Sequence, residues 1–227
     1  MTIAENIAAL QKRIQAACDR TGRNRSEITL VAVSKAKPPE LVMEAIHAGI
    51  TDIGENRIQE AAAKKPLVTL PARWHLVGTL QTNKVKKALE LFEVIHSVDS
   101  FHLAEEIQRR CEQAQRRVKV LVEVNTTAEP TKHGVTPDGL AGLVAALLRL
   151  DRLELLGLMT IGPGWAVQEP EASRSCFREL ARLAEETRQR FGIPLPHLSM
   201  GMSSDFEPAI EEGATILRIG TAIFGPR

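Results

Sequence analysis

The sequence predicts a single (β/α)8 TIM-type barrel that is preceded by an N-terminal helix. About eight strand-like segments occur along the chain with helical patterns between them, which is the element count of this fold. The length of 227 residues is close to the roughly 250 residues that are typical of it. No linker rich in proline, glycine or serine divides the chain, so we expect one domain over residues 1–227. A doubly wound open sheet is the alternative.

The first elements have clear local signals. Thr2 and Glu5 have the spacing of a capping box, and apolar residues then recur at helical spacing up to a stop near Gly22. Residues 28–34 are rich in β-branched side chains and apolar on both faces, which is typical of a parallel strand covered on two sides. A helix is expected to follow from Pro38, because proline is common in the first turn of helices.

The alternation of strand and helix continues to the end of the chain. Apolar residues recur at helical spacing in residues 101–111 and 177–191. A second capping box, formed by Ser204 and Glu207, predicts a helix after the seventh strand. The remaining strands are expected near residues 50–54, 74–78, 94–98, 118–125, 153–161, 196–200 and 216–220.

Composition and charge exclude several classes of protein. Lys and Arg number 29 against 28 Asp and Glu, so no overall field draws the chain onto nucleic acid or an anionic membrane. The longest apolar stretch, residues 143–148, is too short to span a bilayer, and the N-terminus lacks the pattern of a signal peptide. The three cysteines form no C-x-x-C pair, so neither a metal site nor a disulfide framework is indicated. We expect a cytoplasmic protein, and a monomer, that binds a small ligand.

Polar residues follow the first strands, where barrel enzymes carry their sites. Lys35 shares a strand face with apolar residues, and desolvation there would turn its amine into a nucleophile toward carbonyls. A solvated lysine is the alternative. Glu55 and Asn56 end the second strand, and His75 lies in the third, either as a general base or as a packing residue. We expect these groups to cluster at the mouth of the barrel, with Lys132 in a loop after the fifth strand.

The last two strands point to a phosphate site. Ser199 and Gly201 follow the seventh strand, and Gly220 and Thr221 follow the eighth. Glycine lets a ligand approach the backbone, helix N-termini offer N–H groups, and barrels commonly hold phosphate at these two loops. A carbonyl that condenses with Lys35 and a phosphate at these loops fit pyridoxal phosphate or a sugar phosphate.

Arg218 helps to choose between these ligands. A buried cation needs an acceptor, which a pyridine nitrogen or a carboxylate such as Glu55 or Glu123 would supply. An arginine at the ring nitrogen keeps that nitrogen unprotonated and makes the cofactor a poorer electron sink.

Together these segments resemble the pyridoxal-phosphate homeostasis family (YggS/PROSC) across nearly the whole chain and in the family's order. The family often has tyrosine where this chain has Arg57, and often glutamine where it has Glu123, which leaves open the charge and solvent access of the mouth. The matching segments are residues 33–35, 37–38, 54–56, 59–60, 74–75, 78, 80–81, 83–84, 98–100, 124–125, 129, 132, 134, 157–159, 199–203, 205, 218–221 and 223–225.

The resemblance implies a barrel like the N-terminal domain of alanine racemase, with pyridoxal 5'-phosphate as cofactor. Lys35 would be the lysine of the internal aldimine, Asn56 would lie beside the cofactor, and Arg218 would lie near its ring nitrogen. Phosphate contacts are implied at Ser199, Gly201, Gly220 and Thr221.

The resemblance further implies a protein that binds the cofactor as a Schiff base and acts in vitamin B6 homeostasis, without established catalytic turnover. Enzymes that accept the cofactor are its expected partners. A pyridoxal-phosphate racemase is the alternative, but two-base racemases of this fold use a tyrosine, and the chain contains none. A Schiff-base aldolase would share the lysine and the phosphate site. We therefore expect a carrier, not an enzyme.

Overall fold

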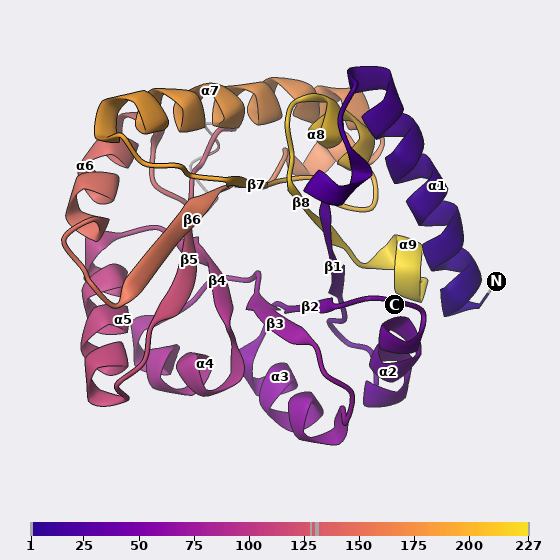
Figure 1. The fold of residues 1–227 in the computed structure, drawn as a ribbon, viewed down its shortest axis with the longest axis horizontal. Coiled ribbons are helices and arrows are strands. Elements are labelled where there is room, and N and C mark those ends of the chain that lie inside the picture. Colours follow the sequence, from indigo (N-terminus) through magenta and orange to yellow (C-terminus); the bar gives the residue numbers. More distant parts are fainter. Residues whose placement is uncertain (1, 128, 130–131, 227) are drawn as a thin grey trace.

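The structure, a computed structural model, describes residues 2–127, 129 and 132–226. Within these residues, eight parallel strands close into a barrel in which β8 pairs with β1 (Figure 1). The barrel confirms the predicted fold class and excludes the open sheet. The strands are β1 (Thr29–Val33), β2 (Asp52–Glu55), β3 (Arg73–Leu76), β4 (Val94–Val98), β5 (Val118–Glu123), β6 (Leu153–Met159), β7 (His197–Ser199) and β8 (Ile216–Ile219).

Helices surround the barrel, and those between the first and the last of them connect successive strands (Figure 1). They are α1 (Ile3–Thr21), α2 (Pro39–His47), α3 (Ile58–Lys64), α4 (Val85–Leu91), α5 (Phe101–Gln113), α6 (Pro137–Leu147), α7 (Arg174–Phe191), α8 (Phe206–Glu211) and α9 (Thr221–Phe224). Short 3-10 turns occupy Arg25–Glu27, Lys65–Leu67, Thr82–Lys84, Gly164–Val167 and Pro170–Ser173.

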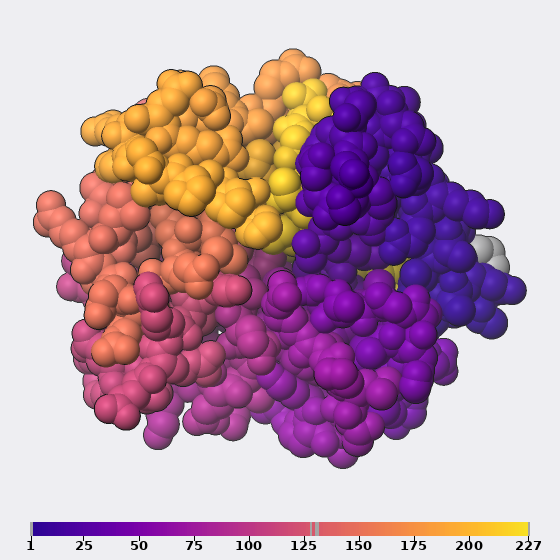
Figure 2. Space-filling view, in the orientation of Figure 1, coloured from indigo at the N-terminus to yellow at the C-terminus, as the bar shows by residue number. Residues whose placement is uncertain are grey.

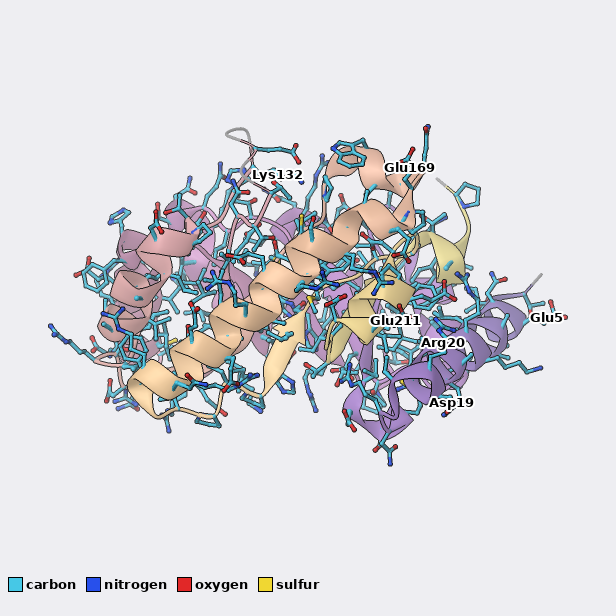
Figure 3. All side chains as sticks on the ribbon, turned by 90° about the horizontal axis from the view of Figure 1, so that it is seen from above. Glu5, Asp19, Arg20, Lys132, Glu169 and Glu211 are labelled. Atoms are coloured by element: carbon cyan, nitrogen blue, oxygen red, sulfur yellow. The ribbon has the colours of Figure 1, made fainter. Side chains whose placement is uncertain are left out.

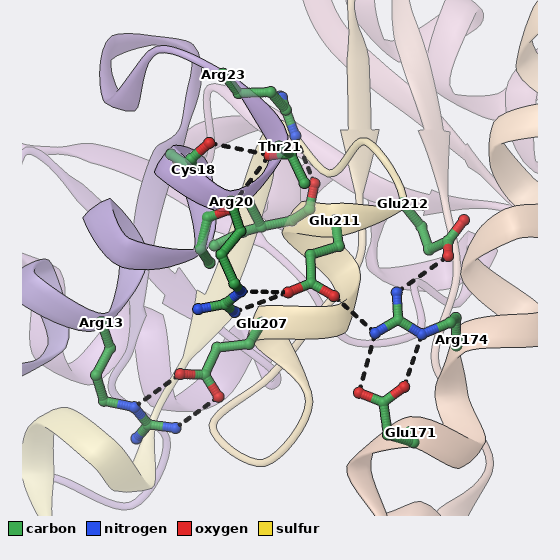
Figure 4. A network of polar contacts seen from close by, with 12 residues as sticks. Arg13, Cys18, Arg20, Thr21, Arg23, Glu171, Arg174, Glu207, Glu211 and Glu212 are labelled. Carbon is green, nitrogen blue, oxygen red and sulfur yellow. Dashed lines mark hydrogen bonds and ion pairs between the residues drawn. The ribbon is translucent and has the colours of Figure 1, made fainter.

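Helix α1 precedes the barrel, as predicted, and packs beside its last helices. The capping box of Thr2 and Glu5 is formed, and Gly22 ends the helix in the left-handed conformation at φ 66°. Figure 2 shows the first residues, in indigo, directly against the last residues, in yellow. Arg13 and Arg20 of α1 pair with the α8 carboxylates Glu207 and Glu211 (Figure 4). These ion pairs tie the beginning of the chain to its end.

The second predicted capping box is wrong. Helix α8 begins at Phe206, one residue later than that box would place it, and its N-cap Asp205 makes no side-chain capping bond. The Asp205 carboxylate instead accepts from the N–H of Met202 at 2.7 Å, and the Glu207 carboxylate accepts from Arg13 at 3.1 Å. The Glu207 side chain, which the local pattern assigned to a cap, therefore pairs with α1, a helix far away in sequence.

Apolar side chains form two groups, one on each side of the sheet. The larger lies between the strands and the helices, and includes Trp74, Phe177 and Phe206. The smaller fills part of the barrel interior, and its buried members are Val31, Val94, Leu121, Met159 and Ile216. Above and beside this inner group the interior is polar, because histidine, serine and arginine side chains also point into it. The interior therefore combines an apolar layer with a hydrogen-bonded one.

Strands β1 and β8 are neighbours, although they stand at opposite ends of the sequence. Val31 is paired with Arg218 in their register. Just beyond β1, the Lys37 ammonium donates to the carbonyl oxygens of Phe224 at 3.1 Å and Pro226 at 2.7 Å. The loop after the first strand is thereby attached to the C-terminal residues, next to the place where the barrel closes.

Candidate functional site

Two adjoining cavities open where the strands end. The first, of about 400 Å3, is lined by Lys35 and Arg218, and we call it the lysine cavity. The second, of about 430 Å3, is lined by Glu123, and we call it the glutamate cavity. Both cavities share Asn56, Val77 and Ile161 in their linings. A ligand in the lysine cavity therefore has polar and charged groups on a second side.

Lys35 lies two residues after the end of β1 and is half-buried at the mouth, as predicted from its position at the strand end. Its turn is closed by a bond from the Lys37 N–H to the Ser34 carbonyl at 3.0 Å. Within the turn, Ala36 adopts φ 57° and donates its N–H to the Glu60 carboxylate at 2.9 Å. A bond within the turn and a bond from α3 thus hold the backbone that carries the lysine.

Glu55 does not reach the mouth, contrary to the expectation from its place at a strand end. Gly54 faces the barrel interior, since a Cβ there would meet Val31, so the next side chain faces the helices. There the fully buried Glu55 carboxylate accepts from the Ser34 hydroxyl at 2.6 Å and from the Lys64 ammonium. Burial raises the pKa of Glu55, while these two bonds act to lower it. The carboxylate supports the residue before Lys35 and is not an acceptor for Arg218.

The loops after β7 and β8 meet beside Lys35. Gly220 and Thr221, both predicted, line the lysine cavity together with Ser203. The Ser203 hydroxyl accepts from the N–H of Ala222 at 3.2 Å, which joins the two loops. The sequence pattern did not single out Ser203, although it lies within the same serine-rich segment as Ser199.

Ser199, expected at the phosphate site, lies apart from these loops, and its hydroxyl contacts Arg218 instead of lining the lysine cavity. It is the last residue of β7 and is fully buried. Its hydroxyl accepts from Arg218 at 2.7 Å and is 2.9 Å from Nδ1 of His96. Because the side chain points into the barrel, its hydroxyl supports Arg218, and Ser203 supplies the serine hydroxyl in the cavity lining.

Gly201, expected at the phosphate site, has a packing role in the structure. It adopts φ 90°, and a Cβ at this position would lie 2.6 Å from Cβ of Ala209. The glycine therefore allows α8 to pack closely beneath the loop, rather than lining the lysine cavity itself. It acts on the site indirectly, through the path of the residues that follow it.

Arg218 is a buried cation that faces the lysine cavity, as its position on β8 predicted. Its guanidinium donates to the Ser199 hydroxyl and, at 2.8 Å, to the carbonyl oxygen of Thr160. Burial lowers its pKa to about 10, and the negative charge of Glu123 acts in the opposite direction. Arg218 therefore stays charged at neutral pH. Of the two carboxylates considered from the sequence, Glu123 is the one whose charge acts on it.

His75 lies inside the barrel, below the mouth, and belongs to a hydrogen-bonded pair. Its Nδ1 is 2.9 Å from Nε2 of His96, and its Nε2 is 2.8 Å from Oδ1 of Asp52. Both ring nitrogens are thus hydrogen-bonded inside the barrel, which confirms that His75 is a packing residue and not a general base at the mouth. His96 went unnoticed in the sequence, although it shares strand parity with Val94, which points into the interior.

Glu123 lines the glutamate cavity and is itself buried. Burial raises its pKa to about 7, against the effect of the Arg218 cation. In the folded protein the carboxyl therefore binds a proton more tightly than at the ordinary value of 4.5. Its ionisation should cost stability as the pH rises from about 4.5 through about 7.

Glu123→Gln should remove this cost. Above pH 7 the variant is expected to be more stable than the wild type by up to about 3 kcal/mol, and below pH 4.5 the difference should vanish. Urea unfolding between pH 4 and pH 8 measures the profile. Glu90→Gln is an exposed control. At neutral pH it should make the protein less stable than the wild type, because the Lys87 hydrogen bond lowers the pKa of Glu90 and so favours its ionised form in the folded protein. A constant difference across the pH range would contradict the prediction.

The outer rim carries charged side chains. Arg57, at one of the departures from the family pattern, is 77% exposed and pairs with Glu60 at 3.7 Å. Lys132 pairs with Glu129 at 2.9 Å and donates to the Gly162 carbonyl at 2.8 Å. Figure 3 shows Lys132, which follows β5, and Glu169, which follows β6, at the same edge of the molecule. The Lys132 contact connects these two loops over the glutamate cavity.

The described residues contain no cluster of three or more metal-ligating side chains. The three cysteines are buried and unpaired in the part of the chain that the structure describes. No helix among the described residues is long and apolar enough to cross a membrane.

The barrel and its lysine-bearing mouth define the class of protein. The family model of the alanine racemase N-terminal domain matches residues 5–227. Solved structures below 25% identity share the fold, among them a D-threonine aldolase from Filomicrobium marinum at 16% identity and TM-score 0.79, with 98% of this chain and 59% of that one covered.

Within this class, the chain belongs to the pyridoxal phosphate homeostasis protein family. The family member from Aquifex aeolicus is 46% identical, with 100% of this chain and 99% of that protein covered. The one from Pseudomonas aeruginosa is 41% identical, with coverages of 100% and 96%. The structure of PipY from Synechococcus elongatus with PLP bound has a TM-score of 0.86 at 36% identity, and covers 99% of this chain and 100% of that one.

Proposed function

We propose that this protein binds pyridoxal 5'-phosphate at Lys35 and acts in vitamin B6 homeostasis. The observation that carries the proposal is the lysine cavity, in which an amine, a buried guanidinium and two hydroxyl-bearing loops face one space. The PipY structure with PLP bound, which has the same fold, supports the assignment.

The residues of the cavity fit the chemistry of this cofactor. Lys35 supplies an amine for covalent attachment of the carbonyl carbon, and Ser203, Gly220 and Thr221 supply polar groups for the phosphate. Arg218 supplies a permanent cation, held by two hydrogen bonds, for the ring nitrogen. Asn56 lines both cavities and would contact one side of the ligand. When bound, the cofactor supplies an electrophilic carbonyl carbon and an electron-withdrawing ring.

We further propose that the chain is a carrier, not an enzyme. The chain contains no tyrosine, so it lacks the second proton carrier that a two-base racemase of this fold would use. The lysine cavity continues into the glutamate cavity, which leaves room for a second molecule to reach the lysine. We propose a single domain that acts as a monomer in the cytoplasm and passes the cofactor to enzymes that require it.

Borohydride reduction tests the proposal. Purified protein with pyridoxal phosphate should absorb in the visible range, and reduction should fix the cofactor to the Lys35 peptide, as mapped by mass spectrometry. Lys35→Ala is the matched control and should lose both signals while its circular dichroism spectrum is unchanged. If the alanine variant kept the same absorbance, the assignment of Lys35 would be wrong.

A second measurement separates the carrier from the racemase. In deuterated water, amino acids incubated with the loaded protein should keep their configuration on the timescale of turnover. Rapid inversion with deuterium incorporation would restore the racemase interpretation and overturn the carrier proposal. An aldolase would retain Lys35 reactivity toward sugar phosphates but show no pyridoxal absorbance.

A further inference from the structure

A line of side chains, hydrogen-bonded end to end, runs through the barrel interior beneath the lysine cavity. It begins at Arg218, whose Nη1 lies 2.7 Å from Oγ of Ser199. From there it passes to Nδ1 of His96 at 2.9 Å, from Nε2 of His96 to Nδ1 of His75 at 2.9 Å, and from Nε2 of His75 to Oδ1 of Asp52 at 2.8 Å. All five side chains are buried, and we call them the interior chain.

Hydrogen counting gives the interior chain a direction. Arginine can only donate, so the Ser199 oxygen accepts from Arg218. Among the described residues, Nδ1 of His96 is the one acceptor in contact with this buried hydroxyl, so its hydrogen is paired only if it goes to that nitrogen. An imidazole that accepts at Nδ1 carries its proton on Nε2 and is neutral. His96 therefore donates to Nδ1 of His75, and His75 in turn donates from Nε2 to Asp52.

The charges at the two ends agree with this direction. Burial lowers the pKa of His96 well below its ordinary value, and the Arg218 cation acts in the same direction. At the far end, burial acts to raise the pKa of Asp52, but the hydrogen bonds from His75 and Thr51 outweigh it and keep the group anionic. A cation and an anion thus terminate a row of neutral dipoles that all point the same way.

The end at Asp52 lies at the opposite end of the barrel from the cavities. Asp52 is the first residue of β2, and its carboxylate is 3.5 Å from the guanidinium of Arg73, which is 55% exposed. The Thr51 hydroxyl donates to the other carboxylate oxygen at 2.6 Å. The interior chain therefore connects the surface at the N-terminal ends of the strands with the arginine in the lysine cavity.

We propose that Ser199, His96, His75 and Asp52 are positioning residues that fix the orientation of Arg218 in the lysine cavity and convey the charge of Asp52 to it. The proposal rests on the proposed function insofar as Arg218 acts on the bound cofactor. Each residue acts through the next, and only Arg218 lines the cavity. Two of the arginine's donors are committed to Ser199 and to Thr160, so the guanidinium plane has one orientation.

The direction of the interior chain can be tested on cofactor-free protein. Nitrogen-15 NMR of the histidine rings at pH 7 should show His75 and His96 neutral and protonated at Nε2. Ser199→Ala removes the hydroxyl that donates to His96, and is expected to change the Nδ1 chemical shift of His96. The exposed His47 in α2 serves as a reference, and its chemical shifts should not change. Protonation of either interior histidine at Nδ1 in the wild type would overturn the proposed direction.

The effect on the site is tested with pyridoxal phosphate as the probe. Asp52→Asn keeps an acceptor for His75 but removes the charge, and is expected to raise the dissociation constant about tenfold and to shift the absorbance maximum of the bound cofactor. Thr51→Val is the matched control, because it removes the other hydrogen bond to Asp52 and leaves the interior chain intact. Equal effects of the two variants would overturn the positioning role. If the wild type failed to bind the cofactor, the proposed function would fall, while the NMR result would still decide the direction of the chain.

Discussion

Lys64→Ala is expected to lower the free energy of unfolding by about 3–5 kcal/mol, because it leaves a buried carboxylate without its cation. Glu55 is fully buried, and Lys64 is 7% exposed. The ammonium also donates to the Ser34 carbonyl at 2.7 Å, so the substitution removes two contacts next to Lys35. Urea denaturation at pH 7 measures the change, and retention of pyridoxal phosphate should fall with it.

Two further variants give this prediction its controls. Lys87→Ala removes a lysine that is 52% exposed and paired with Glu90, and should change stability by less than about 0.5 kcal/mol. Combining Lys64→Met with Glu55→Gln removes both charges and should recover most of the loss. A small effect of Lys64→Ala, equal to that of Lys87→Ala, would show that the buried pair does not stabilise the fold.

Gly201→Ala is expected to destabilise the protein by about 3 kcal/mol and to weaken cofactor binding at the same time. Alanine at φ 90° is strained, and its methyl group would meet Ala209 at 2.6 Å and Cα of Phe206 at 3.1 Å. Relief requires the loop to move, and Met202 and Ser203 of that loop line the lysine cavity. Thermal unfolding and titration with pyridoxal phosphate measure the two effects.

A glycine in the middle of α6 provides the comparison. A Cβ added at Gly142 in that helix would meet no neighbouring residue within 4 Å, so Gly142→Ala should stabilise by about 0.5–1 kcal/mol. Gly201→Ala combined with Ala209→Gly should recover the part of the loss that comes from contact with Ala209, leaving the parts that come from φ and from contact with Phe206. If Gly201→Ala were as well tolerated as Gly142→Ala, the packing role of Gly201 would be refuted.

Local patterns predicted the order of the elements because each strand and helix has its own period. The strand 94–98 was predicted with the bounds that the structure has, and the first helix ends at Gly22 as expected. Lys35, Gly220 and Thr221 were placed together for a general reason, since all three follow strands of one closed sheet.

Side-chain partners from distant segments could not be predicted in this way. Glu55 faces Lys64, which lies on the following helix, and only the packing of that helix decides which charge the carboxylate meets. Ser199 meets His96 across 103 residues of sequence, so no local pattern separates its role from that of Ser203. The family resemblance carried the same uncertainty, because it matched the segment that contains both serines.

The departure at Glu123 has a physical meaning that the sequence alone left open. The structure buries this carboxyl near Arg218 and raises its pKa to about 7. Its charge therefore changes in the range in which the protein would hold its cofactor. Arg57, the other departure, lies at the exposed rim and pairs with Glu60.

The pairing of β1 with β8 also governs when the site comes into existence. Lys35 follows the first strand of the barrel, while Arg218 and Thr221 belong to the last strand and its loop. A chain emerging from the ribosome exposes the lysine with the first strand of the barrel, but it has no lysine cavity until β8 and the loop after it dock against β1. Because a ligand that binds only the closed barrel stabilises it by mass action, loading with cofactor would mark the completion of folding. Incomplete chains would be left without it.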